Sequence, residues 1–233
     1  MSEVARASHE SRPSCRWLGR VEYGAALALQ EEILRDRGAR GDTVLLLEHD
    51  PVYTTGRGGS PENLPVAGAV PGVPVYRIGR GGDATYHGPG QLVGYPLVDL
   101  RRRGGDVHAF LRSLEHAIVR TLAGFGIRGF AWSGRTGVWV DEEDPRKIAS
   151  IGIGVRRGIT CHGFALNVAL DLSPFDAIVP CATPGVRMTS IEREGASPIP
   201  SVCEVAEVAA VHLGDELRAR REALPRPSQA AKR

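Results

Sequence analysis

Two glycine-containing apolar segments joined by a short basic turn restrict the fold of this chain most strongly. KIASIGIGV (147–155) and ITCHGFALNV (159–168) have the length and apolar content of strands, and the turn at 156–158 between them predicts a hairpin. Gly152 and Gly163 lie inside these strands, where glycine is typical of sites that another backbone or a ligand approaches closely. We therefore expect a hairpin whose backbone faces such a neighbour.

The rest of the chain interleaves strands and helices irregularly. Apolar runs predict strands at 42–49, 75–80, 91–100 and 136–140, with a Pro- and Gly-rich loop at 60–74. A first helix is expected over about 21–37, ending at Gly38, and a last one near 201–220, where Ser201 and Glu204 form a capping-box pattern. The clearest helical stripe has apolar residues at three- and four-residue steps and Gly126 beyond its end: Val107, Phe110, Leu111, Leu114, Ile118 and Leu122. Without a steady βαβ rhythm, the pattern favours an α+β fold with a mixed β-sheet and packed helices.

The organisation is that of one domain with two loose ends. The chain has 233 residues, enough to bury a substantial core. Residues 1–15 and 224–233 are polar, short-sided or Pro-containing, and we predict that both are disordered. Residues 16–223 are expected to form the single domain.

Charge and cysteine content exclude several classes of protein. The 29 basic and 27 acidic residues nearly balance, so no global basic field indicates nucleic-acid binding. Arg101–Arg103 and Arg156-Arg157 are local candidates for docking patches, or else solvated turns. No apolar run is long enough for a membrane span and no signal-peptide core is present. The four cysteines form no CxxC pair, which is typical of free thiols in a reducing cytoplasm, so we expect a soluble cytoplasmic protein.

Lysine is almost absent from the chain. Of its 29 Lys and Arg residues only two are lysines, Lys147 and Lys232. A lysine retained at one internal position favours a role that a guanidinium cannot perform, namely losing a proton near neutral pH or acting as a compact ammonium beside a nucleophile. Lys147 followed by Cys181 supplies the parts of an acyl-transfer pair. The alternative is a surface lysine at the end of the charged turn DEEDPRK.

The densest motif is RGGDATYHGPGQ (80–91). Its glycines let the backbone approach a ligand closely and present N–H groups to it. The spacing is not that of a phosphate-binding loop that opens a helix. His87 in this motif could act as a general base, donate a hydrogen bond to a carbonyl, or hold the loop in place.

Four motifs in order resemble the lipoyl(octanoyl) transferase family. They are EHDPVYTTG (48–56), RGGDATYHGPGQ (80–91), KIASIGIGVRRGITCHGFALNV (147–168) and DLSPF…IVPC (171–181), and the resemblance covers about residues 20 to 215. It implies a fold similar to the catalytic domain of biotin and lipoate protein ligases.

The resemblance also implies the reaction. An octanoyl or lipoyl group moves from acyl carrier protein to a lysine of lipoyl domains, in 2-oxoacid dehydrogenase complexes and the glycine cleavage H protein, with no cofactor and no metal. By the same resemblance Cys181 carries the acyl group as a thioester and Lys147 activates it. The implied substrate-binding residues are Arg80, Gly81, Gly82, Asp83, Ala84, Thr85, Tyr86, His87, Ser150, Ile151, Gly152, Gly163, Phe164 and Ala165.

Two alternatives share parts of this pattern. An ATP-dependent lipoate or biotin protein ligase would have the same fold without needing Cys181, and a non-catalytic acyl-carrier-binding protein would need neither Cys181 nor Lys147. The chain departs from the family in having Ala182, where glycine usually follows the cysteine. Cys161 and Cys203 are interpreted as small apolar fillers and Cys15 as part of the tail. A zinc site at Cys161, His162 and Cys181 lacks the usual ligand spacing.

Overall fold

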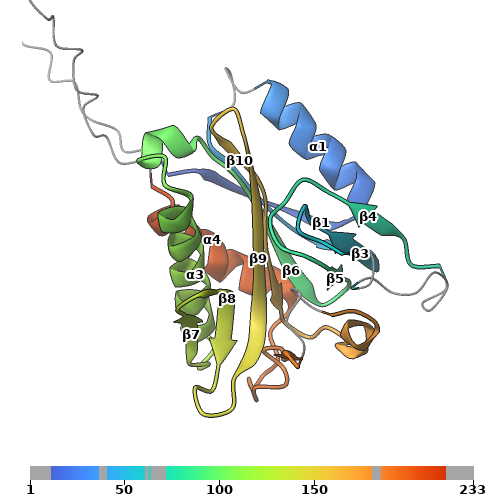
Figure 1. Ribbon diagram of the computed structural model, residues 1–233. Coiled ribbons are helices and arrows are strands. Elements are labelled where there is room, and N and C mark those ends of the chain that lie inside the picture. The colour runs from blue at the N-terminus through green and yellow to red at the C-terminus, as the bar shows by residue number, and fades with distance from the viewer. Residues whose placement is uncertain (1–11, 37–40, 61–62, 64–71, 180–184, 219–233) are drawn as a thin grey trace, which may run out of the picture.

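The main element of the fold is an eight-stranded mixed sheet with helices on both sides (Figure 1). The computed structural model describes residues 12–36, 41–60, 63, 72–179 and 185–218. The strands lie in the order β1-β2-β6-β10-β9-β8-β7, and β11 pairs with β9. The strands are β1 (Ser14–Val21), β2 (Thr43–His49), β6 (Gln91–Leu97), β7 (Gly129–Trp132), β8 (Arg135–Val140), β9 (Arg146–Arg156), β10 (Ile159–Asn167) and β11 (Arg187–Met188).

The apolar runs of the sequence become strands buried on both faces. In β2, Val44 and Leu46 join the cluster beneath the helices of one face, whereas Leu45 and Leu47 join the cluster on the other face. All four side chains are at most 1% exposed. A strand covered on both sides has no need of polar residues at alternate positions, which accounts for the continuous run VLLL.

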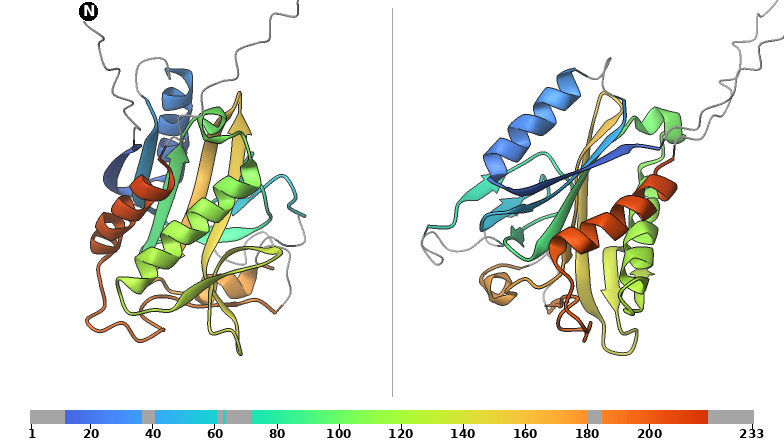
Figure 2. Two further views of the ribbon diagram at one scale, coloured as in Figure 1. Left: turned by 90° about the vertical axis from the view of Figure 1, so that its left-hand side faces the viewer. Right: turned by 180° about the vertical axis from the view of Figure 1, so that it is seen from behind.

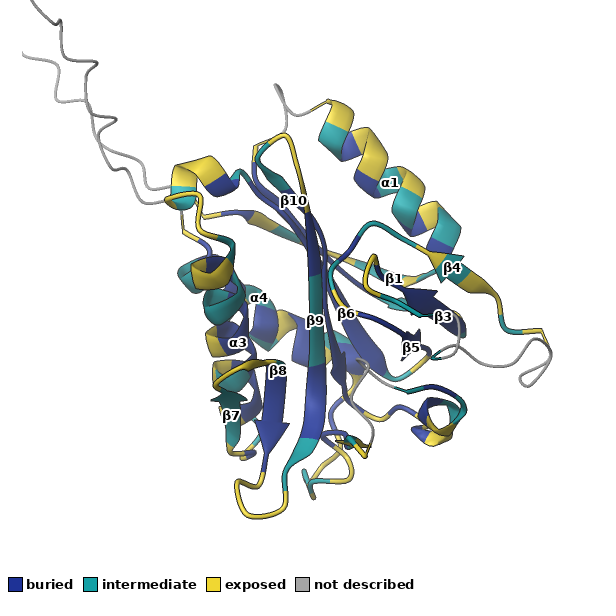
Figure 3. Cartoon of the chain, viewed as in Figure 1, coloured by how far each residue is buried: buried dark blue, intermediate teal, exposed yellow. Residues whose placement is uncertain are grey.

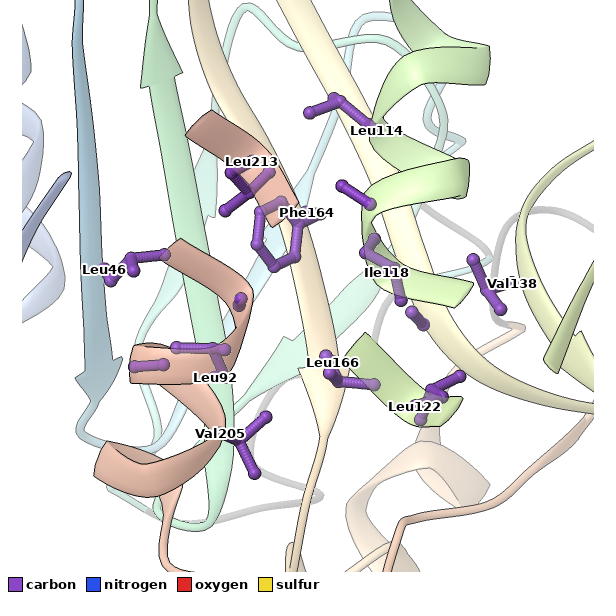
Figure 4. Packing of buried hydrophobic residues seen from close by; sticks show 14 of the residues in the cluster. Leu46, Leu92, Leu114, Ile118, Leu122, Val138, Phe164, Leu166, Val205 and Leu213 are labelled. Atoms are coloured by element: carbon purple, nitrogen blue, oxygen red, sulfur yellow. The ribbon is translucent and has the colours of Figure 1, made fainter. Parts of the chain in front are cut away.

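Helices α3 (Val107–Ala123) and α4 (Val202–Glu216) cover one face, and α1 (Tyr23–Arg35) lies on the other (Figure 2). Each helix begins at a side-chain cap: Glu22, Asp106 or Ser201. The predicted capping box of Ser201 and Glu204 is present in full. Beneath α3 and α4 the apolar side chains of helices and strands pack against one another (Figure 4). In Figure 3, β6 and β10 are mostly dark blue, whereas α3 and α4 show dark blue, teal and yellow in turn. Burial of this cluster is the main stabilising contribution to the fold.

A second, three-stranded sheet lies on the α1 side (Figure 1). It has the order β4-β3-β5, from β3 (Val52–Thr55), β4 (Val75–Arg77) and β5 (Thr85–His87). Tyr53 and Tyr86 of this sheet pack against Phe175 of the short helix η3 (Ser173–Ala177). The small sheet therefore holds the chain just before the glycine-rich segment, at β4, and within that segment, at β5.

The predicted fold class, an α+β arrangement with a mixed sheet, is confirmed, and so is the hairpin of β9 and β10. The first and the last helix both end earlier than predicted, α1 at Arg35 and α4 at Glu216. Gly38 and most of the predicted loop 60–74 lie outside the described residues, as do residues 1–11 and 224–233 of the predicted loose ends. No helix in the described ranges is both long and apolar enough to cross a bilayer.

One prediction at the N-terminus was wrong. We predicted disorder through residue 15, but β1 begins at Ser14 and pairs in parallel with β2. Cys15, interpreted above as tail, packs against the core, and its thiol lies 3.6 Å from the carbonyl of Ala210, to which it donates. The pairing partner of β1 is about 30 residues away in the sequence, so the local composition of 12–15 gave no sign of it.

Candidate active site

The hairpin brings two of the predicted substrate-binding segments into direct register. Gly163 pairs with Gly152, Phe164 with Ile151, and Ala165 with Ser150. Two segments of three residues that are separated by ten positions in sequence thus become one patch of the sheet.

The glycine-rich segment closes over this patch from the side. The N–H of Gly81 donates to the carbonyl of Ile153 at 2.8 Å, so the loop continues the sheet where β8 no longer accompanies β9. A Cβ on Gly152 would lie 2.8 Å from the carbonyl oxygen of Gly81. Glycine at 152 is what permits the loop to lie against the strand.

A narrow cavity of about 50 Å³ lies between the loop, the hairpin and α1. Twelve of the fourteen predicted substrate-binding residues line it: Arg80, Gly82, Asp83, Ala84, Thr85, His87, Ser150, Ile151, Gly152, Gly163, Phe164 and Ala165. Tyr23, Ile78, Val93, Tyr95 and His162 complete the lining. We call this the inner cavity.

Two of the predicted residues lie elsewhere. Gly81 lines a second cavity, of about 400 Å³, which we call the outer cavity. The ring of Tyr86 turns toward Tyr53 and Phe175 in the apolar cluster of the small sheet. The structure therefore places Tyr86 as support for β5, outside both linings.

The two charged residues at the start of the motif hold the loop. Arg80 is buried, and its guanidinium donates to the carbonyl and the hydroxyl of Thr54, both at 2.9 Å. The carboxylate of Asp83 accepts from the N–H of Ala84 at 2.6 Å and from the side-chain amide of Asn63. Charge-assisted bonds of this kind fix the loop more firmly than neutral ones.

His87 is held as a neutral imidazole within a buried network. Its Nδ1 donates to Gln91 Oε1 at 2.8 Å, and Gln91 donates in turn to Asn167 at 2.9 Å. Burial, followed by the nearby His49 and Arg80, lowers the pKa of His87 to about 3. Of the three roles left open by the sequence, this geometry favours holding the loop in place.

A cluster that the sequence did not indicate lies beside His87. His49 is fully buried, donates from Nδ1 to the carbonyl of Val21, and accepts from the hydroxyl of Tyr95, both at 2.7 Å. Tyr23 stacks on the ring of His87 at 6.0 Å. Burial lowers the pKa of His49 and raises those of both tyrosines, so the group is uncharged at neutral pH. Tyr23 and Tyr95 form an uncharged aromatic wall of the inner cavity, and His49 supports it through its bond with Tyr95.

Lys147 lies on β9 in the wall of the outer cavity. It is 3% exposed, and its Nζ lies 5.4 Å from the centre of the Trp139 ring. The interpretation of Lys147 as an exposed surface lysine was therefore wrong. Gly82, Ile151 and Gly152 line both cavities, so the amine lies in a space that adjoins the inner cavity.

Two residues shape the surroundings of Lys147 and were missed from the sequence. A Cβ on Gly137 would lie 2.7 Å from Cε of Lys147, and Gly137 has φ +119°, which side chains rarely adopt. The N–H of Gly137 donates at 2.9 Å to Glu115, whose side chain is fully buried on α3. Burial raises the pKa of Glu115, against the lowering effect of the Gly137 bond, Arg112, His116 and Lys147. A carboxylate one turn after Leu111, within the apolar stripe, was the available signal.

Cys181 and Ala182 lie outside the described residues. The chain on either side of them is close to Lys147 or to the loops of the site. Val186 lines the outer cavity, Met188 pairs with Lys147 in β11, and the N–H of Val179 donates to Asn63 at 3.2 Å.

The arginine clusters make intramolecular contacts. Arg103 is paired with Asp42 at 2.7 Å in a buried position, Arg101 with Asp99 at 2.8 Å, and Arg156 with Glu31. Arg156 stands nine residues beyond Lys147 on β9, roughly 30 Å at strand spacing. Cys161 is buried in the cluster beneath α1, as expected of a small filler, and Cys203 is half-buried. Within the described part of the chain, no three His, Cys, Asp or Glu side chains are grouped as metal ligands.

Comparisons with known proteins show which family this chain resembles in sequence. Residues 22–213 match the lipoyl protein ligase A/B catalytic domain. An octanoyltransferase of Geobacter metallireducens is 49% identical over 187 residues, 79% of this chain and 84% of the relative. One of Syntrophotalea carbinolica is 46% identical over 86% of this chain and 92% of the relative.

A solved structure supports the fold independently. Lipoate-protein ligase A bound with ATP superposes with a TM-score of 0.69 at 19% identity, over 92% of this chain and 90% of that one. At that identity the likeness concerns the fold, and it agrees with the ligase-like catalytic domain expected from the sequence.

Proposed function

Since the chain belongs to the lipoyl protein ligase A/B catalytic domain family, and within it to the octanoyltransferases, we propose that it carries octanoyl groups to lysine side chains in lipoate biosynthesis. The donor is octanoyl-acyl carrier protein. The acceptors are lipoyl domains of 2-oxoacid dehydrogenase complexes and the glycine cleavage H protein. The observation that carries this proposal is the buried amine of Lys147 in a cavity adjoining the inner cavity.

The first half-reaction forms an acyl-enzyme. The Cys181 thiolate attacks the thioester carbonyl of the donor, the carrier's thiolate leaves, and the Lys147 ammonium supplies its proton. A free thiol is only a few per cent ionised at pH 7. A neighbouring ammonium stabilises the thiolate and so raises that fraction. A covalent intermediate also lets two bulky protein partners dock one after the other.

The second half-reaction delivers the acyl group. The amine of the acceptor lysine attacks the Cys181 thioester, the amide forms, and Cys181 leaves as thiolate. Lys147, now neutral, accepts the proton that the attacking amine loses. Each cycle thereby returns Lys147 and Cys181 to their starting states without ATP or metal.

The acyl chain occupies the inner cavity. Glycines at 82, 152 and 163 remove side chains from its walls, and Ala165 and Phe164 add apolar surface. The bonds of Arg80 and Asp83 keep the loop in position around the chain. Preorganised walls of this kind lower the entropic cost of holding the thioester near the nucleophile.

Intact-mass spectrometry after mixing with octanoyl-acyl carrier protein tests the proposal. We expect one octanoyl adduct on the wild-type protein, released by hydroxylamine or by a lipoyl domain, and none on Cys181→Ala. An undiminished adduct on Cys181→Ala would overturn the thioester assignment. A strict requirement for ATP would favour a ligase, the activity of the structural relative that is bound with ATP.

A further inference from the structure

A row of paired residues crosses the sheet beneath the inner cavity. Ser150 on β9 pairs with Ala165 on β10, and Ala165 pairs with Val93 on β6. Val93 pairs in turn with Leu47 on β2. Directly opposed residues of antiparallel strands face the same side of a sheet. Three of the four belong to the cluster on the α1 side, so the whole row lies on the face that α1 covers.

The side chains of this row become larger from β9 toward β2. Ser150 and Ala165 are small, whereas Val93 and Leu47 are branched. Ser150, Ala165 and Val93 line the inner cavity. Leu47 does not line it, and neither does any other described residue of β2. Val93 is 1% exposed and Leu47 is fully buried, so the floor of the cavity ends at Val93 with packed side chains behind it.

The other end of the row lies on the face that carries Lys147. The register between β8 and β9 skips Ile148, which makes a β-bulge there. Ile148 and Ala149 consequently both join the layer beneath α3 and α4. This leaves Lys147 on the opposite face, together with Ser150. Without the bulge, a step of three residues would put these two side chains on different faces.

The amine of Lys147 lies close to the start of the row. A Cβ on Gly137 would lie 2.5 Å from the carbonyl oxygen of Ala149 and 3.3 Å from Nζ of Lys147, so these two atoms are no more than about 6 Å apart. Ser150 is the next residue along β9. No described residue of β10, β6 or α1 lines the outer cavity. From the amine, the inner cavity therefore extends away across β10 and ends at β6.

The length of this path matches a medium-length acyl chain. Neighbouring strands lie about 4.8 Å apart, so β6 is about 10 Å from β9. The eight carbons of an extended octanoyl group span about 9 Å, and two more carbons add about 2.5 Å. A chain whose thioester lies beside Lys147 therefore brings its eighth carbon to Val93, and a tenth carbon would overlap with that side chain.

Hydrogen bonds fix the wall beside Val93. Tyr95 lies two residues further along β6, belongs to the same cluster and also lines the inner cavity. Its hydroxyl donates to Nε2 of His49 at 2.7 Å, and Nδ1 of His49 donates to the carbonyl of Val21 at 2.7 Å. Moving Tyr95 aside would leave buried polar groups unpaired, which is costly. The cavity is therefore not readily widened at this end.

We propose that Val93 is a specificity-determining residue, which stops the acyl chain and limits it to about eight carbons. The proposal rests on the proposed function, because that function puts an acyl chain in the inner cavity. It narrows the substrate class to straight chains that end over β6.

The test compares hexanoyl-, octanoyl- and decanoyl-acyl carrier protein as donors in transfer to a lipoyl domain. For the wild-type protein we expect kcat/KM to be at least about tenfold lower with decanoyl than with octanoyl, since an overfilled pocket discriminates by that order. Val93→Ala removes two methyl groups and should raise the decanoyl-to-octanoyl ratio at least about tenfold. Val93→Ile adds one methylene and should raise the hexanoyl-to-octanoyl ratio, and this variant retains the test if Val93→Ala does not fold.

Val44→Ala is the matched control. Val44 is also fully buried but belongs to the layer beneath α3 and α4, so its removal should lower stability without changing either ratio. Equal use of decanoyl and octanoyl by the wild-type protein would overturn the proposal. Unchanged ratios in both Val93 variants would overturn it as well.

Calorimetric titration with free hexanoate, octanoate and decanoate separates failure of the chain stop from failure of the proposed function. If no acyl transfer occurs, but affinity rises from six to eight carbons and falls at ten, and Val93→Ala removes the fall, the chain stop stands and the transfer proposal fails. If affinity rises steadily to ten carbons in the wild-type protein and in Val93→Ala alike, the chain stop is wrong, whether or not transfer occurs.

Discussion

The apolar layer beneath α3 and α4 and the polar site around the two cavities are built from adjacent residues of the same strands. On β10, Leu166 belongs to the apolar layer and Ala165 lines the inner cavity. On β9, Ile148 is fully buried in the layer while Lys147 lines the outer cavity. The difference lies in the neighbours: side chains fill one region, and glycines and backbone leave space in the other. Stability and chemistry are thus separable by single substitutions.

The largest effect on the site should come from Lys147→Arg. In the proposed mechanism the guanidinium keeps the positive charge but cannot accept a proton, so delivery to the acceptor should fall about 10²- to 10⁴-fold while self-acylation survives in part. Stopped-flow measurement of each half-reaction tests this. Lys232→Arg, the same change at the other lysine of the chain, is the matched control and should transfer normally. Near-wild-type delivery by Lys147→Arg would reduce Lys147 to an electrostatic role.

The converse experiment perturbs only the apolar layer. Leu213 on α4 is 1% exposed, and Leu213→Ala should lower the free energy of unfolding by about 2–5 kcal/mol. Because Leu213 touches neither cavity, kcat/KM per folded molecule should stay within twofold of wild type. Urea unfolding and assays at low temperature measure the two quantities. Val211→Ala, at a position of the same helix that is 57% exposed, should change stability by less than about 0.5 kcal/mol.

Mild acid should lower the free energy of unfolding through the buried histidines of the polar site. Burial lowers the pKa values of His87 and His162 to about 3 and about 4, whereas an unfolded histidine titrates near 6.5. Below pH 6.5 the unfolded chain therefore binds protons that the folded chain does not, and stability falls with pH. Each histidine should account for about 2 kcal/mol between pH 7 and pH 5. Urea unfolding of His87→Asn and His162→Asn at both pH values should show a smaller difference than wild type; an identical pH dependence would contradict this assignment.

The smallest expected effect concerns the packing around Lys147. In Gly137→Ala the new Cβ would meet the carbonyl of Ala149 at 2.5 Å and Cε of Lys147 at 2.7 Å. Displacement of the amine should lower the rate of acyl delivery about tenfold, which corresponds to about 1.4 kcal/mol of activation free energy. Gly126→Ala is the control, since Gly126 also has a positive φ but nothing within 4 Å of a Cβ. A comparable loss of delivery in both variants would show that backbone strain alone, and not the lysine's position, is responsible.

The features that could be predicted from the sequence are local. The hairpin of β9 and β10 follows from two apolar runs around a basic turn, and the start of α4 from Ser201 and Glu204. The grouping of twelve predicted residues around one cavity came from the resemblance, because no local pattern indicates which loop lies against which strand.

The features that were missed depend on partners distant in sequence. β1 is ordered by its pairing with β2. Two strands of the small sheet that were not predicted, β3 and β5, pair with each other although they are distant in the sequence. The importance of Gly137 depends on where Lys147 and Ala149 lie across the sheet. The left-handed backbone of His162 had no local signal either, because histidine within an apolar strand does not specify it.

The two-residue strand β11 has a consequence for how the backbone of Lys147 is held. β10 pairs with β9 only as far as Ala149, and β11 occupies the same edge at Arg146 and Lys147, with the N–H of Thr189 donating to the carbonyl of Lys147 at 3.0 Å. β8 holds the opposite edge at Trp139 and Val140. The backbone of Lys147 is therefore paired with a strand on each edge of β9, and one of these strands, β11, belongs to the chain that follows Cys181. In the proposed mechanism, orienting the amine therefore requires only a change of the Lys147 side chain and no rearrangement of its backbone.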